Sequence, residues 1–312
     1  MRDAFVNALL ALAEKNSNIM LLTGDLGFGA FDQFIERYPK QFLNAGVAEQ
    51  NMMGVATGMA LSGYVVYVYS IGNFATLRCL EQIRNDACYH EANVKIVICG
   101  GGFSYGSLGM SHHATEDLSI MRALPNIKII APCDAWEASK ATYALFHKSG
   151  VGYLRLEKNE PPSKYLLPES QFEIGHSRQL KAGCDITLIA TGSIVLEALE
   201  AAYQLSEKNI AVGVISMHTI KPVDRNAIIT AARETGGIIT IEEHTIEGGL
   251  GSIVAEVCLE NGVSTARFAR IGLCDTFSSI VGSQTFLRKK YKMDAESIVQ
   301  KVIEKMNVGI EQ

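Results

Sequence analysis

The sequence predicts an α/β protein built from two doubly wound domains, a mainly parallel-sheet domain followed by a smaller one. Short apolar runs alternate with longer helical patterns along all 312 residues. The runs are continuously hydrophobic, which is typical of parallel strands covered on both faces. A proline-rich stretch without periodicity interrupts the alternation near the middle of the chain. At about 150 residues per domain, this length suits two domains.

The first domain is expected to span residues 1–160. It begins with an amphipathic helix that carries Phe5, Leu9 and Leu12 at helical spacing. Its other elements follow from the apolar runs and helical patterns. Strands are expected at 19–23, 65–69, 94–99, 127–131 and 153–156, and helices at 51–62, 75–90, 115–124 and 136–147.

The segment EKNEPPSKYLLPES holds three of the chain's seven prolines, and a linker is therefore expected at 161–177. A second alternation fills 178–312 and predicts a smaller sheet. Strands are expected at 186–190, 211–215, 238–242 and 267–271, and helices at 195–208, 225–235, 251–261 and 294–306.

Composition excludes several classes of function. The net charge is −5 and both signs are scattered, so neither nucleic acid nor a membrane surface is an expected partner. No apolar run reaches the ~20 residues of a membrane-spanning helix, and no secretory leader pattern opens the chain, so a cytoplasmic protein is expected. The seven cysteines include no CxxC pair and indicate reduced thiols, with no metal site on this chain.

The most informative segment is NAGVAEQNMMGVATGMALSG, at 44–63. It places Glu49 at the start of a helix made of small and apolar residues. A carboxylate in such surroundings is costly unless it has a dedicated partner. The alternative is an acid that is merely favoured by the positive end of the helix dipole. Position alone leaves both interpretations open.

This segment resembles the pyrimidine-binding segment of the transketolase family, which includes the deoxyxylulose-phosphate synthases. The stretch EEHTIEGGLGS at 242–252 is similar to the C-terminal domain of the same enzymes. The resemblance covers almost the whole chain and implies a thiamine-diphosphate pyrimidine-binding domain followed by a transketolase C-terminal domain. It also implies that Glu49 is catalytic. In the family this glutamate hydrogen-bonds N1′ of the cofactor's aminopyrimidine and so promotes proton loss from C2 of the thiazolium.

The resemblance extends to other cofactor contacts. YSIGNFATLRCLEQIRNDACYH at 69–90 follows the family pattern and implies that Phe74 stacks on the aminopyrimidine, with Arg78 and Gln82 beside it. Packing in the core is the alternative for Phe74. In GDLGFG, at 24–29, Asp25 matches an acidic residue at the cofactor site, although an aspartate that stabilises its own turn is an equal alternative.

Substrate contacts are implied by GGGFSYGSLGMSHHATED, at 100–117, and by GYLRLEK. His112 matches a family histidine that faces the substrate oxygens, and a neutral imidazole can move a proton near pH 7. His113 stands where many transketolases have glutamine, and the resemblance implies that it is a second substrate contact. Arg155 matches an arginine that holds the substrate phosphate. Glu116 and Asp117 are expected to cap the next helix.

The chain departs from the family in two ways. Gly100, Gly101 and Leu108 replace residues that bind the donor sugar, so the sugar is either bound differently or carries no phosphate. No GDG motif is present, although the family uses one to hold Mg²⁺ and the diphosphate. The resemblance therefore implies a partner: an N-terminal transketolase subunit that carries the metal motif, in an α₂β₂ assembly.

The resulting hypothesis is the C-terminal subunit of a split transketolase. It would transfer a two-carbon ketol unit from a ketose to an aldose, on sugar or sugar-phosphate substrates. Two alternatives stay open. One is the β subunit of a 2-oxoacid dehydrogenase, which differs by its need for a lipoyl acceptor. The other is a non-catalytic regulatory subunit of the same fold, against which Glu49 and His112 argue.

Overall fold

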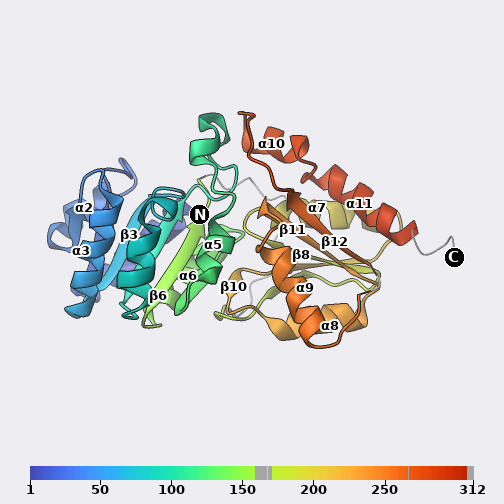
Figure 1. The fold of residues 1–312 in the computed structure, drawn as a ribbon, viewed down its shortest axis with the longest axis horizontal. Coiled ribbons are helices and arrows are strands. Elements are labelled where there is room, and N and C mark those ends of the chain that lie inside the picture. The colour runs from blue at the N-terminus through green and yellow to red at the C-terminus, as the bar shows by residue number, and fades with distance from the viewer. Residues whose placement is uncertain (159–166, 168–170, 266, 308–312) are drawn as a thin grey trace.

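Two open sheets, one in each half of the chain, lie side by side in the computed structural model (Figure 1). The structure describes residues 1–158, 167, 171–265 and 267–307. Most of the linker expected at 161–177 therefore lies outside the described residues. Both sheets are mostly parallel and covered by helices, which confirms the predicted fold class.

The first sheet has seven strands in the order β10-β5-β6-β4-β3-β1-β2. All neighbours are parallel except β10, which runs antiparallel to β5 and comes from the second half of the chain. β1, β4 and β6 are buried along their whole length, which explains why their sequences are continuously hydrophobic. The strands are β1 (Ile19–Thr23), β2 (Phe42–Asn44), β3 (Val65–Ile71), β4 (Val94–Cys99), β5 (Ile127–Ile130), β6 (Val151–Leu156) and β10 (Thr219–Lys221).

Helices cover both faces of this sheet. α1 (Arg2–Ala13) and α6 (Ala135–Phe146) pack together on one face, and α3 (Glu49–Leu61) and α5 (Asp117–Ala123) contribute to the core on the other. α2 (Asp32–Arg37) is a short helix beyond β1. The start of α6 is fixed by its N-cap, since the Asp134 carboxylate accepts a hydrogen bond of 2.7 Å from the backbone N–H of Glu137.

The single helix expected at 75–90 was wrong. The segment forms a 3₁₀ turn at Leu77–Cys79, one turn of α-helix in α4 (Leu80–Gln82) and a π-helical turn at Ile83–Cys88. Just before it, the Thr76 hydroxyl donates a hydrogen bond of 2.8 Å to the Gly72 carbonyl. Such irregular helical turns often occur at functional sites.

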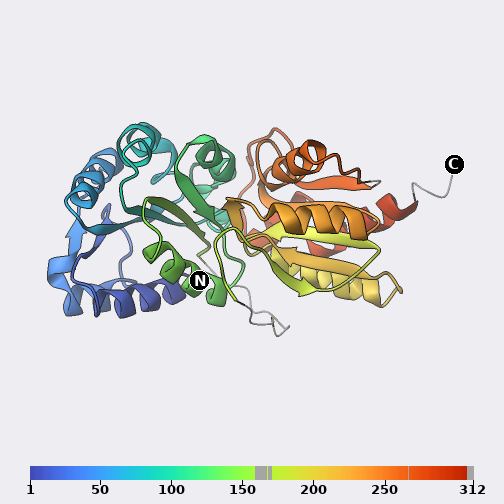
Figure 2. The same ribbon diagram turned by 90° about the horizontal axis from the view of Figure 1, so that it is seen from below.

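The second sheet has the order β12-β11-β8-β9-β7, with only β7 antiparallel to its neighbour. α7 and α11 share a core on one face and α8 and α9 share a core on the other (Figures 1 and 2). The elements are β7 (Arg178–Lys181), β8 (Ile186–Thr191), α7 (Val195–Ser206), β9 (Val212–Ser216), α8 (Arg225–Glu234), β11 (Ile238–Thr245), α9 (Leu250–Glu260), β12 (Phe268–Leu273), α10 (Gln284–Lys290) and α11 (Ala295–Asn307).

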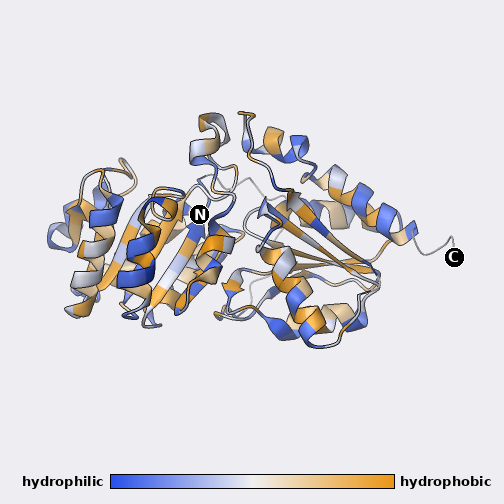
Figure 3. Cartoon of the chain, in the orientation of Figure 1, coloured by the Kyte–Doolittle hydropathy of each residue, from blue (hydrophilic) through white to orange (hydrophobic). Residues whose placement is uncertain are grey.

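The two halves share a hydrophobic core. One cluster of buried side chains runs from Met52 in α3 through Leu118 in α5 to Val254 in α9. Figure 3 shows that α11, which packs on the second sheet, has one apolar side and one polar side. Within the described residues, no helix is both long and apolar enough to span a membrane. Of the seven cysteines, all free, only Cys184 and Cys274 are exposed.

Candidate active site

The candidate site lies at the carboxyl edge of the first sheet. β1 is flanked by β2 on one side and β3 on the other, so the loops that leave β1 and β3 diverge. Open α/β sheets bind ligands in the crevice formed at such a reversal of strand order. The segments that follow β1, β2, β3 and β4 carry most of the side chains named from the sequence, among them Asp25, Glu49, Phe74 and His112.

Glu49 begins α3 and its side chain is only 1% exposed. Its Oε2 atom accepts a hydrogen bond of 2.7 Å from Nη1 of Arg78. Its Oε1 atom is buried and has no hydrogen-bond partner among the described residues. Gly24, after β1, lies against it, because a Cβ on Gly24 would approach the Glu49 side chain to 3.8 Å. A buried carboxylate with one free oxygen is suited to accept a hydrogen bond from a ligand.

Phe74 lies between Arg78, the partner of this carboxylate, and His112 on the loop after β4. The Arg78 guanidinium carbon lies 4.5 Å from the centre of the Phe74 ring. On its other side, Phe74 meets His112 edge to face, with 5.2 Å between ring centres. His112 is half-buried and its Nδ1 lies 3.0 Å from the Ser111 hydroxyl. The structure thus brings Glu49, Arg78, Phe74 and His112 together, as the family pattern implies.

His113 is more deeply placed than His112. Its ring is buried, and Nε2 lies 3.2 Å from the Gly106 carbonyl, which fixes the tautomer with hydrogen on Nε2. Burial lowers the pKa of His113 and so keeps the ring neutral. Nδ1 is then an acceptor, and it has no partner in the described part of the chain. The Asn73 amide donates to the carbonyls of Ser111 and His113 and leaves its own Oδ1 equally unpaired.

A hollow of about 350 Å³ lies beside these groups, although Glu49 and His112 are not among the residues that line it. Its walls include Phe74 and Arg78 from the β3 loop and His113 from the β4 loop, with Phe277 and Ser278 from the second half of the chain. The second half therefore contributes directly to the candidate site, which sequence reasoning missed. A larger hollow of about 590 Å³ lies between β7, β9 and α8, but it contains none of the side chains named from the sequence.

Asp25 and Gln82 were also named from the sequence, and no hydrogen bond within the described residues joins either of them to Glu49, Phe74 or His112. Asp25 has a left-handed backbone (φ 59°) and is exposed. Its N–H donates to Asn44 Oδ1 at 2.9 Å and its Oδ1 accepts from Asn44 Nδ2 at 3.0 Å, so it stabilises its own turn. Gln82, in α4, has a buried Oε1 without a hydrogen-bond partner among the described residues.

Arg155 does not reach the site, which corrects the expectation that it holds a substrate phosphate. Its side chain is 2% exposed. It donates to Asp117 Oδ2 at 2.9 Å and to the carbonyls of Ala114 and Glu243. The acceptors that surround it leave no free face for a ligand. Gly101 makes room for it, since a Cβ there would come within 2.8 Å of the guanidinium carbon.

Asp117 is likewise not the helix cap that was expected. It is the first residue of α5, buried, and it also accepts a hydrogen bond of 2.6 Å from the Tyr153 hydroxyl. Glu116 occupies the N-cap position without a side-chain capping bond. Both corrections have one cause: the buried Arg155 requires a carboxylate partner.

Lys158 is a cation that sequence reasoning missed. It follows β6 at the same sheet edge and is exposed. Its Nζ lies 5.0 Å from the centre of the Tyr105 ring, and Tyr105 in turn is 6.2 Å from His112. The signal was in the sequence: Lys158 stands three residues after Arg155, just beyond the carboxyl end of the strand, where side chains can face a ligand.

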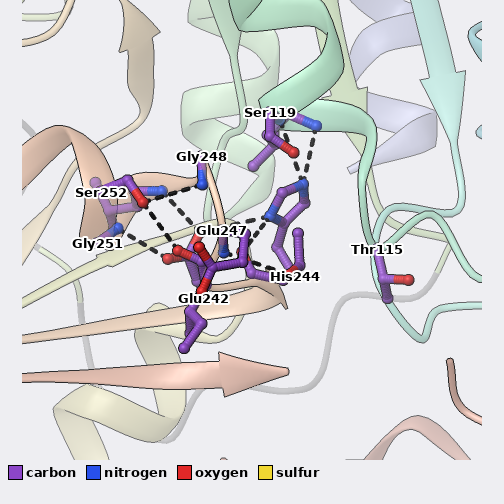
Figure 4. Close-up of polar contacts among 12 residues, drawn as sticks. Thr115, Ser119, Glu242, His244, Glu247, Gly248, Gly251 and Ser252 are labelled. Carbon is purple, nitrogen blue, oxygen red and sulfur yellow. Dashed lines mark hydrogen bonds and ion pairs between the residues drawn. The ribbon is translucent and has the colours of Figure 1, made fainter. Parts of the chain in front are cut away.

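His244, in β11 of the second half of the chain, forms hydrogen bonds with the start of α5, next to the candidate site (Figure 4). Its Nδ1 is 2.7 Å from the Thr245 carbonyl, so that nitrogen carries the hydrogen. Nε2 accepts from the N–H of Leu118 at 3.1 Å and of Ser119 at 3.4 Å, in the first turn of α5. Burial lowers the pKa of His244 to about 4. The neutral ring therefore has a structural task.

Comparison with known proteins identifies the family. Residues 1–164 match the transketolase pyrimidine binding domain, and residues 175–298 match the transketolase C-terminal domain. The chain belongs to the transketolase family.

Its relatives in this family include separate transketolase subunits. A putative transketolase C-terminal section of Methanocaldococcus jannaschii is 39% identical over 308 residues, covering 98% of this chain and 96% of the relative. One subunit of the apulose-4-phosphate transketolase of Phocaeicola vulgatus is 37% identical, with 97% and 96% covered. A solved structure described as a split gene transketolase, inactive beta4 tetramer, superposes with a TM-score of 0.87 at 36% identity, covering 98% of this chain and 97% of that one.

Proposed function

We propose that this chain is the C-terminal subunit of a thiamine-diphosphate-dependent transketolase that transfers a two-carbon ketol unit from a ketose to an aldose. The observation that carries the proposal is Glu49, a buried carboxylate with one unpaired oxygen beside the half-buried ring of Phe74. The imino tautomer of the aminopyrimidine needs these two contacts, an acceptor for its N1′–H and a flat apolar face. Thiamine diphosphate, when bound, supplies the carbon nucleophile and electron sink of the reaction.

The diphosphate and its Mg²⁺ would be held by an N-terminal subunit that carries the GDG motif, in an α₂β₂ assembly. Two features support a partner at this edge. Apolar side chains that line the hollow are exposed, among them Leu77 at 44%, Met110 at 55% and Phe277 at 67%. A surface of this kind is typical of a protein interface. The related split transketolase is inactive as a β4 tetramer, and we expect this chain alone to lack activity too.

His112 and His113 would handle the sugar oxygens. His113 Nδ1 and Asn73 Oδ1 are unpaired acceptors on the wall of the hollow, so they suit a ligand that donates hydrogen bonds, such as a sugar hydroxyl. His112 lies between Phe74 and Tyr105, where a neutral imidazole could exchange a proton with a substrate hydroxyl. Lys158 takes the phosphate role first expected of Arg155, because it is an exposed cation at the same sheet edge.

The test is calorimetric titration of thiamine diphosphate with Mg²⁺, first into this chain and then into its mixture with the GDG-bearing subunit. Tight binding only by the mixture is expected, together with ketol transfer. Glu49→Gln should lower turnover by about a hundredfold or more without unfolding the chain, whereas Glu36→Gln, an exposed control in α2, should not. Wild-type turnover in the Glu49 variant would refute the assignment.

A further inference from the structure

Arg78 occupies both surfaces that the aminopyrimidine would use. Its Nη1 is 2.7 Å from Glu49 Oε2, and its guanidinium carbon is 4.5 Å above the centre of the Phe74 ring. Glu49 beneath it is 1% exposed, whereas the Arg78 side chain is 44% exposed. The arginine therefore covers the carboxylate from the solvent side.

A guanidinium shares two properties with the imino tautomer of an aminopyrimidine, in which N1′ carries a hydrogen. It is planar, so it can lie against an aromatic face, and it presents N–H donors in its own plane to a carboxylate. The contacts with Phe74 and Glu49 use these two properties. Lysine would lack the planar face, and a neutral amide would lack the charge.

We propose that Arg78 is a placeholder for the aminopyrimidine. This inference rests on the function proposed above. In the chain without cofactor, Arg78 keeps the buried Glu49 carboxylate paired and the Phe74 face covered. When the aminopyrimidine enters, Arg78 swings outward into solvent, and both contacts pass to the ligand.

The need for a placeholder follows from burial. A carboxylate removed from water and left unpaired is strongly destabilising. The Oε1 atom of Glu49 is already unpaired, so within the described chain the carboxylate depends on the single hydrogen bond from Arg78. The ion pair lets the subunit fold with its catalytic acid in position before the ligand arrives.

Arg78 is also free to leave, unlike Arg155. Its side-chain contacts within the described residues are with Glu49 and Phe74, and it stands on the 3₁₀ turn at Leu77–Cys79. Arg155 is 2% exposed and is held by a carboxylate and two carbonyls. Of the two arginines, only Arg78 can swing out without breaking a buried network.

The experiment measures cofactor binding to the reconstituted complex of this chain with the GDG-bearing subunit. Stopped-flow and calorimetric titrations with thiamine diphosphate and Mg²⁺ compare the wild type with Arg78→Leu. We expect the variant to bind about three- to tenfold more tightly, mainly through faster association, because no ion pair or cation–π contact must be broken first.

Arg37→Leu is the matched control. Arg37 is 43% exposed, lies 5.3 Å from the centre of the Tyr38 ring and pairs with Glu14 at 3.5 Å, so it has the same kinds of contact away from the hollow. Its loss should leave cofactor binding unchanged. Weaker binding by Arg78→Leu would mean that Arg78 is a cofactor ligand, and equal binding would mean that it has no part in cofactor binding. Either result would overturn the placeholder proposal. Failure of the wild-type mixture to bind cofactor would instead overturn the proposed function as well.

Thermal unfolding of this chain alone gives a second readout. Arg78→Leu should lower its melting temperature, because Glu49 is left buried and unpaired, and adding Glu49→Gln should restore most of the loss. Arg37→Leu should have little effect, since its partner Glu14 is 61% exposed. If Arg78→Leu leaves the melting temperature unchanged, Glu49 does not need the arginine and the placeholder is refuted.

Discussion

At the scale of single residues, two cationic side chains three positions apart differ in burial. Arg155 lies within β6 and is buried against Asp117, while Lys158 lies beyond the end of the strand and is exposed. An arginine whose hydrogen bonds are all made to internal acceptors stabilises the fold. An exposed lysine at the carboxyl edge of the sheet can bind an anion. Position relative to the strand end decides between the two roles.

Lys158→Gln should therefore raise the KM of the reconstituted enzyme for a phosphorylated sugar by about tenfold or more, in line with the loss of a charged hydrogen bond. The KM for the same sugar without phosphate should not change. Steady-state kinetics with both sugars make the comparison, and Lys148→Gln, another exposed lysine, is the control. An equal effect on both sugars would remove the phosphate contact from Lys158.

At the scale of elements, His244 joins β11 to the start of α5. Only the neutral ring can accept hydrogen bonds from Leu118 and Ser119, and burial lowers its pKa from 6.5 to about 4. Between these values the unfolded chain binds the proton and the folded chain does not. Stability contributed by this histidine is thus complete above pH 6.5 and is lost as the pH falls toward 4.

His244→Gln should weaken this pH dependence. Over the window from 6.5 to 4, the wild type should lose up to about 3 kcal/mol of unfolding free energy more than the variant. Urea unfolding at several pH values measures the difference. Glu242, whose pKa burial raises to about 7, contributes an opposite slope that both proteins share. The exposed His147→Gln is the control, and parallel curves for wild type and His244→Gln would contradict the assignment.

Elements were predictable where burial and periodicity agreed. The strands at 19–23 and 94–99 match the structure residue for residue, because each is an apolar run buried on both faces. β2, β7 and β10 were missed because each is short and lies at a sheet edge, where one side of the strand is unpaired and the pattern is weak. The helix expected at 75–90 divides into 3₁₀, α and π turns, which the spacing of apolar residues alone does not distinguish.

Only the parts of the candidate site that lie in short sequence motifs could be predicted. Glu49, Phe74, Arg78 and His112 come from short motifs and meet as the family pattern implies. Phe277 could not be inferred, because its place on the hollow depends on how the second half packs against the first. The burial of Arg155 could not be predicted either, because one of its hydrogen-bond acceptors, the Glu243 carbonyl, is 88 residues away in the sequence.

At the scale of the whole molecule, a buried charge network ties the site loops to the second half of the chain. The Glu243 carboxylate accepts from the N–H of Phe103, from Gln284 and from Arg288. Glu157 accepts from Ser193 and from the same Gln284. Burial raises the pKa of Glu243, and the Arg288 guanidinium opposes that rise. With β10 completing the first sheet and one core cluster spanning both halves, the two sheets should unfold together.

We therefore expect one cooperative unfolding transition for the chain, and Arg288→Met to shift it without splitting it. Removing the guanidinium leaves the buried Glu243 without its ion-pair partner, while Glu157 keeps Arg155 as a nearby cation. This should cost about 3–5 kcal/mol of unfolding free energy. Urea unfolding followed by fluorescence and by circular dichroism tests this, because coincident curves mark a single transition. Combining Arg288→Met with Glu243→Gln should cost less than the two separate losses added together, since the variants remove opposite partners of one pair. Two separate transitions in the wild type would mean that the halves unfold independently. A single transition with a loss below about 1 kcal/mol in Arg288→Met would mean that the halves are coupled by apolar packing and not by this network.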